Sequence, residues 1–192
     1  LTSANGDRES SWAGTGSGAE VAVVAEGKID TADVSGLVRG LKDTTRPSVY
    51  LRTTPLTLAD KKIEELAAGV TAKSTLDRMH ALMGAVRDAV DYISDATTTQ
   101  TTAAQALKLG KGVCQDHAHV FISAARTLRV PARYVVGYLL AQDTKLTETH
   151  AWAEAFVPEI GWVGFDAANR LCPTDRYVRL ASGLDSADAA PI

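Results

Sequence analysis

Cysteine is scarce in this sequence. The 192 residues contain two cysteines, Cys114 and Cys172. Two cysteines in a chain of this length do not make the disulfide framework that staples small secreted domains. A bridge between them would also remove Cys114 as a free thiol. We therefore expect two free thiols, a reducing compartment and a cytoplasmic location.

The sequence also lacks a strong excess of charge and a long apolar run. The formal net charge is −3 and the pI is about 5.8, so we expect no basic surface for nucleic acid or an anionic membrane. No apolar run approaches the roughly 20 residues that cross a bilayer. We expect no signal peptide at the start of the chain, and no nucleic-acid and no membrane partner. Leu1 is not a methionine, which is compatible with a natural start further upstream.

Candidate metal ligands are few. His117 and His119 lie close to Cys114 in the sequence. On a helix, Cys114 and His117 share a face, whereas His119 points elsewhere. No second Cys or His cluster completes a zinc set, and no dense acidic loop suggests calcium. We expect no metal and no cofactor.

The sequence changes character near residue 58. Residues 1–20 are rich in Gly and Ser and lack periodicity, which is typical of a flexible arm. Residues 20–30 predict a strand, and Val49 and Leu51 are compatible with a short one. We interpret residues 1–58 as an arm with a partial β-rich region, and residues 59–192 as a separate domain.

Helical patterns come first in that domain and strand patterns follow. Helices are predicted over 59–69, 74–93, 102–110 and from 114 to about 128. Three later segments, 132–140, 150–157 and 161–167, are rich in β-branched and aromatic residues, which is typical of strands. Helices followed by an antiparallel meander place the chain in the α+β class.

Cys114 lies where a loop becomes a helix. Gly110 and Gly112 leave the preceding backbone free to turn tightly. A helix N-terminus presents unpaired N–H groups and the positive end of the dipole, and both stabilise a thiolate. The same N–H groups can hold an oxyanion. From placement alone, Cys114 is equally compatible with a nucleophile and with a small apolar residue at a buried helix start.

A base and its orienting partner follow downstream. A cysteine nucleophile needs both, and His150 and Asp166 lie on two successive predicted strands. If the intervening loop has an odd number of residues, such as 158–160, then Val157 faces Gly161. Trp152 then lies opposite Asp166, and His150 becomes its diagonal neighbour on the same face. An even loop would put Asp166 on the other face.

Four ordered motifs resemble the transglutaminase-like superfamily. They are GVCQDHAH at 112–119, PARYVVGY at 131–138, HAWAE at 150–154 and GWVGFD at 161–166. The sequence is most similar to bacterial transglutaminase-like proteins that are often labelled cysteine proteases. The resemblance covers roughly residues 76–190. It implies a papain/transglutaminase-like core, in which a Cys-bearing helix packs on an antiparallel sheet, and makes residues 59–192 the catalytic domain.

The resemblance also implies roles for individual residues. Cys114 is the nucleophile, His150 the general base and acid, and Asp166 the residue that orients His150. The eukaryotic transglutaminases that the sequence resembles use a tryptophan upstream of the cysteine near the oxyanion, and this chain has none between Trp12 and Trp152. Gln115, Tyr92 and Trp152 are the candidates that line the site or contact the oxyanion.

These residues predict a cysteine-dependent acyl-transfer enzyme that acts on amide or peptide carbonyls through a thioester. Hydrolysis by a cysteine peptidase or amidase is the first interpretation, because water is the default acceptor. Transfer of the side-chain acyl group of a protein glutamine to an amine is an alternative, and so is a non-catalytic binding module that keeps the fold. The expected partners are a peptide or protein substrate and, for transfer, an amine acceptor. The sequence does not define an oligomeric state.

Overall fold

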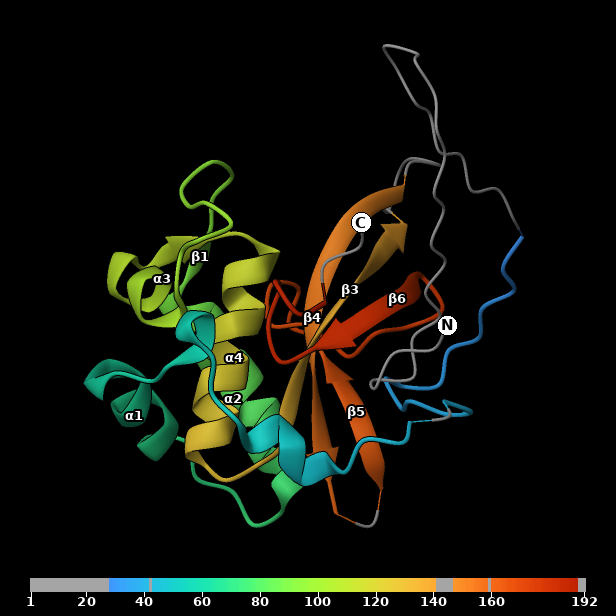
Figure 1. Cartoon of the computed structure of the whole chain (residues 1–192), viewed down its shortest axis with the longest axis horizontal. Helices are drawn as coiled ribbons and strands as arrows, with labels where there is room; N and C mark the ends of the chain where they lie inside the picture. Colours follow the sequence, from blue (N-terminus) through green and yellow to red (C-terminus); the bar gives the residue numbers. More distant parts are fainter. Residues whose placement is uncertain (1–27, 42, 141–146, 159, 190–192) are drawn as a thin grey trace, which may run out of the picture.

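The computed structural model of the chain describes residues 28–41, 43–140, 147–158 and 160–189. In this part of the chain, the helices gather on one side of a β-sheet (Figure 1). The helices are η1 (Pro47–Leu51), η2 (Pro55–Thr57), α1 (Lys61–Ala68), α2 (Thr75–Ala89), α3 (Ala103–Leu109) and α4 (Cys114–Thr127). The strands are β1 (Asp91–Tyr92), β2 (Lys111–Gly112), β3 (Ala132–Leu140), β4 (Thr147–Val157), β5 (Gly161–Phe165) and β6 (Tyr177–Gly183).

The main sheet has the strand order β5-β4-β3-β6, and all of its neighbours are antiparallel. Strands β3, β4 and β5 form a meander, and β6 returns to pair with the free edge of β3. The short strands β1 and β2 form a separate parallel pair. Helices followed by an antiparallel sheet confirm the α+β class.

Helix α4 is the centre of the fold, because it contacts α1, α2 and α3 on one side and β3 and β4 on the other. All of its residues from Asp116 to Arg126 are buried. A helix that is covered all round belongs to a core. The ring of Phe121 on α4 stacks on Phe165 of β5, with centroids 5.4 Å apart. This packing fixes the position of the first residue of α4, Cys114, relative to the strands.

The opposite face of the sheet carries a buried network of charges. Arg133 is fully buried and donates to Glu154 at 2.6 Å and to Asp43. Its guanidinium lies 4.0 Å from the ring centroid of Trp162. Arg179 donates to the other oxygen of Glu154 at 2.9 Å. Asp43 lies in the segment before η1, so its ion pair with Arg133 joins that segment to this face of the sheet.

Arg126 links α4 to segments that are distant in the sequence. Its side chain is 5% exposed. It donates to the carbonyl oxygens of Tyr50, Ala132 and Leu184 and to the Thr57 hydroxyl. A guanidinium has five N–H donors in a fixed fork, and this geometry suits several acceptors at once. One side chain thus joins η1, η2, β3 and the turn after β6 to the central helix.

Most of the predicted elements are confirmed, and the first two differences concern helices. The segment around Val49 forms the 3-10 helix η1 instead of a strand. Pro47 at its first position fixes φ and suits a helical start. Helix α2 ends at Ala89 instead of residue 93, because the next residues form β1 and bond to the loop before Cys114.

Two further differences concern strands. The predicted strand over 20–30 lies mostly outside the described residues, and residues 28–30 are not in a strand. The strand β6 was not predicted, because its sequence, YVRLASG, lacks a clean alternation of apolar and polar residues.

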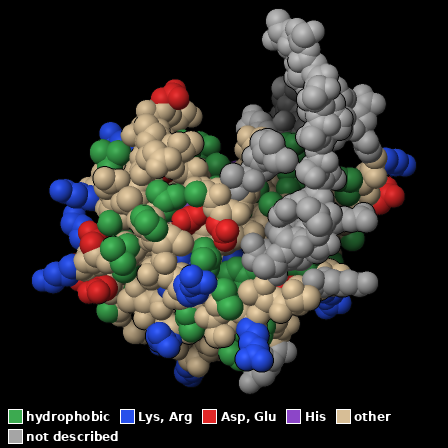
Figure 2. Space-filling view, viewed as in Figure 1, with side chains coloured by type: hydrophobic (Ala, Val, Ile, Leu, Met, Phe, Trp, Pro, Cys, Tyr) green, Lys and Arg blue, Asp and Glu red, His purple; other side chains and the backbone are tan. Residues whose placement is uncertain are grey.

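No helix in the described part of the chain is long and apolar enough to cross a membrane. On the face in Figure 2, Lys and Arg side chains are interspersed with Asp and Glu. Neither sign of charge forms a continuous patch on the part of that face where side chains are coloured by type.

Candidate active site

The loop before Cys114 has a conformation that needs glycine. Helix α3 ends at Gly110, which is left-handed with φ 68°. At Gly112, an added Cβ would lie 2.6 Å from the Cβ of Asp116. The carboxylate of Asp116 turns back onto this loop and accepts from the Val113 N–H at 2.8 Å and from the Thr97 hydroxyl at 2.6 Å. Asp116 therefore holds the loop that delivers Cys114 to the start of α4.

His150 and Asp166 meet on adjacent strands. His150 is in β4, and Asp166 follows the last residue of β5. The His150 Nε2 and the Asp166 Oδ2 are 2.7 Å apart, and both side chains are buried. Asp166 is fixed further by two backbone hydrogen bonds with Leu171, of 2.9 and 3.2 Å.

The register of this hairpin confirms the predicted loop length. Val157 pairs with Gly161, and Ala153 pairs with Phe165. Continued by one residue, the same register puts Trp152 opposite Asp166 and His150 diagonal to it. The odd loop therefore brings the histidine and the aspartate to one face of the sheet, as the spacing predicts.

The charges of this pair follow from its surroundings. Burial disfavours the imidazolium, but hydrogen bonds and charges from Asp166 and Cys114 outweigh burial and raise the pKa of His150 to about 9. Burial alone would raise the pKa of Asp166, yet its hydrogen bonds with His150, Tyr177 and Asn169 lower that pKa below its ordinary range. At neutral pH the site therefore contains an imidazolium beside a carboxylate.

Cys114 completes the arrangement. Its side chain is half-buried at the first position of α4, and it lies close enough to His150 to help raise the pKa of that imidazole. Because Asp166 occupies Nε2 of His150, the ring nitrogen left for the thiol is Nδ1. The structure thus brings together Cys114, His150 and Asp166, the three residues predicted to act as nucleophile, base and orienting carboxylate.

The three other predicted site residues lie at different places. Trp152 is buried and stacks with the His150 ring, with centroids 6.4 Å apart. Gln115 donates to the carbonyl of Thr99 at 3.3 Å, so its amide is turned to the 97–101 loop. Tyr92 lies in β1, is 44% exposed, and stacks on the ring of His117 at 6.0 Å. Of the three, Trp152 is the one in ring contact with the histidine of the site.

Two residues at the site were missed by the sequence reasoning. Asn169 donates to Asp166 Oδ2 through its side chain at 2.8 Å and to Oδ1 through its backbone N–H at 3.2 Å. Its position three residues after Asp166, in a turn, is the local signal that could have pointed to it. Tyr177 donates its hydroxyl to Asp166 Oδ2 at 2.7 Å. No sequence signal pointed to Tyr177, because the strand that carries it was not predicted.

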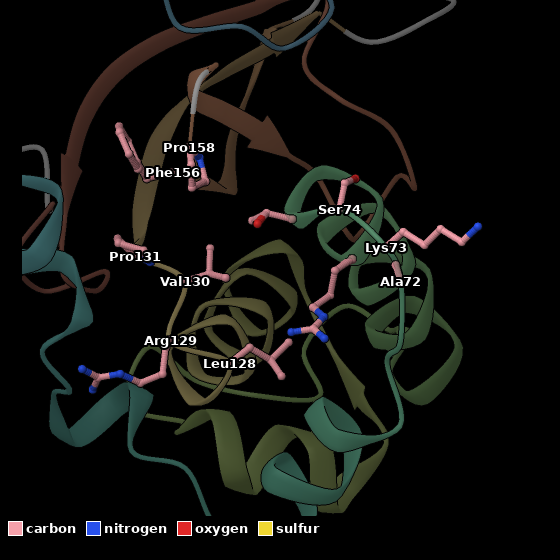
Figure 3. A pocket seen from close by; sticks show the side chains of 11 residues that line it. Ala72, Lys73, Ser74, Leu128, Arg129, Val130, Pro131, Phe156 and Pro158 are labelled. Atoms are coloured by element: carbon pink, nitrogen blue, oxygen red, sulfur yellow. The ribbon is translucent and has the colours of Figure 1, made fainter.

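Cavities in the described part of the chain differ in their relation to this site. The cavity in Figure 3, of about 310 Å³, is lined by Ser74, Leu128 and Phe156 among others. Leu128 follows the last residue of α4, so this cavity lies at the opposite end of that helix from Cys114. A second cavity, of about 430 Å³, borders Gln115, the neighbour of Cys114. No group of three or more His, Cys, Asp or Glu within the described ranges could hold a metal ion.

A family model for the transglutaminase-like superfamily matches residues 64–167, which is more than half of the chain and includes all three residues. The chain belongs to this superfamily. The predicted resemblance and the papain/transglutaminase-like core are therefore confirmed.

Two solved structures have a similar fold. A protein from Cytophaga hutchinsonii assigned as a cysteine protease is 30% identical, with a TM-score of 0.67, and the match covers 81% of this chain and 53% of that one. The periplasmic domain of TgpA from Pseudomonas aeruginosa, solved with ethylmercury, is 21% identical, with a TM-score of 0.52 over 65% of this chain and 49% of that one. The second likeness shows the fold alone.

Relatives in sequence come from mycobacteria. An uncharacterised protein of Mycobacterium leprae is 34% identical over 112 residues, which are 55% of this chain and 39% of the relative. One from Mycobacterium tuberculosis is 33% identical, over 53% of this chain and 36% of the relative. The chain therefore spans less than two fifths of the length of these relatives.

Proposed function

We propose that this chain is the catalytic core of a cysteine-dependent enzyme that transfers acyl groups from amide or peptide carbonyls through a thioester. Water is the acceptor in this proposal, which makes the enzyme a cysteine peptidase or amidase. The observation that carries it is the His150–Asp166 pair, with His150 Nε2 2.7 Å from the carboxylate, and Cys114 close enough to that pair to raise the pKa of His150. Membership of a superfamily with a relative assigned as a cysteine protease supports it.

The first half of the reaction forms the thioester. The Sγ of Cys114 attacks the substrate carbonyl carbon, and the C–S bond forms as the carbonyl oxygen becomes an oxyanion. The backbone N–H of Cys114, at the first position of α4, has no intrahelical acceptor and donates to that oxygen. His150 then gives its proton to the departing nitrogen, the C–N bond breaks, and an amine or ammonia leaves.

The second half releases the acyl group. The now neutral His150 takes a proton from water as the water oxygen attacks the thioester carbonyl. The C–S bond breaks, the thiolate is restored, and the imidazolium again stands beside it. Asp166 keeps its charge throughout and stabilises the imidazolium in both halves, which is the role of the carboxylate in such triads. The cavity beside Gln115 offers room for the substrate residues that flank the carbonyl.

Product analysis tests this proposal. A mixture of peptides rich in Gln and Asn is incubated with the protein, with and without a fluorescent primary amine, and is analysed by mass spectrometry. We expect new peptide termini or side-chain acids in place of amides, both with and without the amine. Amine adducts as the main product would reassign the enzyme as a transferase. No product of any class would contradict catalysis and favour a binding module.

A further inference from the structure

The hydroxyl of Tyr177 reaches the candidate site from β6. It donates to Asp166 Oδ2 at 2.7 Å. The Tyr177 ring lies edge-on to the rings of His150, at 5.9 Å, and Trp152, at 5.4 Å. Residue 177 lies outside the segment that the family model matches, residues 64–167. The site therefore depends on a strand beyond that segment.

We propose that Tyr177 is a positioning residue that fixes the carboxylate of Asp166 for His150. The inference rests on the proposed function of the Cys114, His150 and Asp166 group. The terminal torsion of an aspartate is broad, so the backbone alone does not decide where Oδ2 points. Three donors converge on that oxygen: His150 Nε2, the side-chain amide of Asn169 and the Tyr177 hydroxyl.

Unlike Asn169, Tyr177 is held in place by a strand that is separate from the turn of Asp166. Asn169 lies in the same turn as Asp166, three residues away, and moves with it. Tyr177 belongs to β6, pairs with Leu139 of β3, and donates its backbone N–H to the Thr174 carbonyl. A hydrogen bond from a second strand therefore ties the carboxylate to the frame of the sheet. Burial and the charge of Asp166 raise the pKa of Tyr177, so its hydroxyl keeps the proton that it donates.

Packing alone does not hold the Tyr177 ring. Its side chain is half-buried, and it borders a cavity of about 340 Å³ that Trp152 and Pro173 also line. With empty space along part of the ring, the hydrogen bond of the hydroxyl adds to the ring contacts with His150 and Trp152 in fixing its position at the site. Removing the hydroxyl should leave the sheet intact and free both Tyr177 and the carboxylate to move.

Positioning and simple charge dispersal predict opposite results. If the hydroxyl fixes Asp166, its loss misaligns the carboxylate. The carboxylate then stabilises the His150 imidazolium less, and thiolate formation at Cys114 shifts to higher pH. If the hydroxyl only spreads the charge of Asp166, its loss concentrates that charge on His150. The carboxylate then stabilises the imidazolium more, and thiolate formation at Cys114 shifts to lower pH.

The test is the rate of Cys114 alkylation by iodoacetamide across pH, followed by mass spectrometry of the peptide that contains Cys114. We expect Tyr177→Phe to move the midpoint up by about one pH unit, which slows alkylation about tenfold on the acid side. Tyr138→Phe, a variant of a 38% exposed tyrosine on β3, should match the wild type. Circular dichroism melting should show both variants folded.

Each result is decisive for one claim. An unchanged midpoint in Tyr177→Phe, or a downward shift, overturns the positioning role and leaves the proposed function standing. His150→Ala in the same series separates the two claims. If the wild type reacts as slowly as His150→Ala, the proposed function fails and the inference falls with it.

Discussion

A Cys114→Ala variant should lose at least about a thousandfold in turnover, because removing the nucleophile of a triad leaves little beyond binding and the oxyanion hole. The fold should be kept, since Cys114 is half-buried at the first position of α4 and alanine is a good helix former. The rate of product formation on the peptides that the wild type converts is the measurement, and the melting curve checks the fold.

The second cysteine supplies the matched control. Cys172 is also half-buried and free, and burial raises the pKa of its thiol. It has no contact with His150 among the interactions of the described residues, so Cys172→Ala should keep wild-type turnover. Full turnover in Cys114→Ala, or a loss in Cys172→Ala that equals the loss in Cys114→Ala, would contradict the role given to Cys114.

Glu154→Gln should lower the free energy of unfolding by about 3 kcal/mol, the low end for breaking a buried charge pair. Glu154 is 1% exposed and accepts from Arg133 at 2.6 Å and from Arg179 at 2.9 Å. Glutamine keeps the shape but removes the charge, so the buried Arg133 is left with Asp43 as its one carboxylate partner in the described part of the chain. Urea denaturation followed by fluorescence measures the change.

An exposed ion pair provides the comparison. Glu65 lies 3.9 Å from Lys61 with its side chain 65% exposed. Glu65→Gln should therefore change the unfolding free energy by less than about 0.5 kcal/mol. If Glu154→Gln changes the free energy of unfolding as little as Glu65→Gln does, the buried network does not stabilise the sheet.

The same network predicts a direction with pH. Burial would raise the pKa of Glu154, but the charges and hydrogen bonds of Arg179 and Arg133 outweigh burial and lower it. A carboxylate with a lowered folded-state pKa contributes stability above its unfolded pKa, and that stability is lost as pH falls through the folded value. Glu154→Gln should therefore reduce the acid sensitivity of the fold as well as its stability at neutral pH.

Local signals in the sequence were enough for the elements that carry the triad. The start of α4 at Cys114 follows from the glycines before it. Side chains alternate between the two faces of a strand, so the odd number of residues in the 158–160 loop predicts the face on which Asp166 lies. The loop parity predicts that His150 and Asp166 share a face, whereas the resemblance to the superfamily implies that Cys114 joins them.

Contacts between distant segments could not be read in the same way. β6 is an edge strand that pairs with β3 alone, so its sequence needs no continuous apolar pattern. The hydrogen bond from Tyr177 to Asp166 depends on that pairing and has no sequence signature. For Gln115, adjacency to Cys114 suggested the oxyanion, whereas the helix directs its side chain to Thr99.

The most direct test of the account is the pH dependence of Cys114 alkylation by iodoacetamide in the wild type and in His150→Ala. We expect iodoacetamide to alkylate Cys114 at lower pH in the wild type than in His150→Ala, because the charged His150, whose pKa is raised to about 9, lies beside the thiol. His150→Ala should react only above about pH 8, as an ordinary thiol does. If the two profiles coincide, His150 does not activate Cys114, and the proposed catalytic group is wrong.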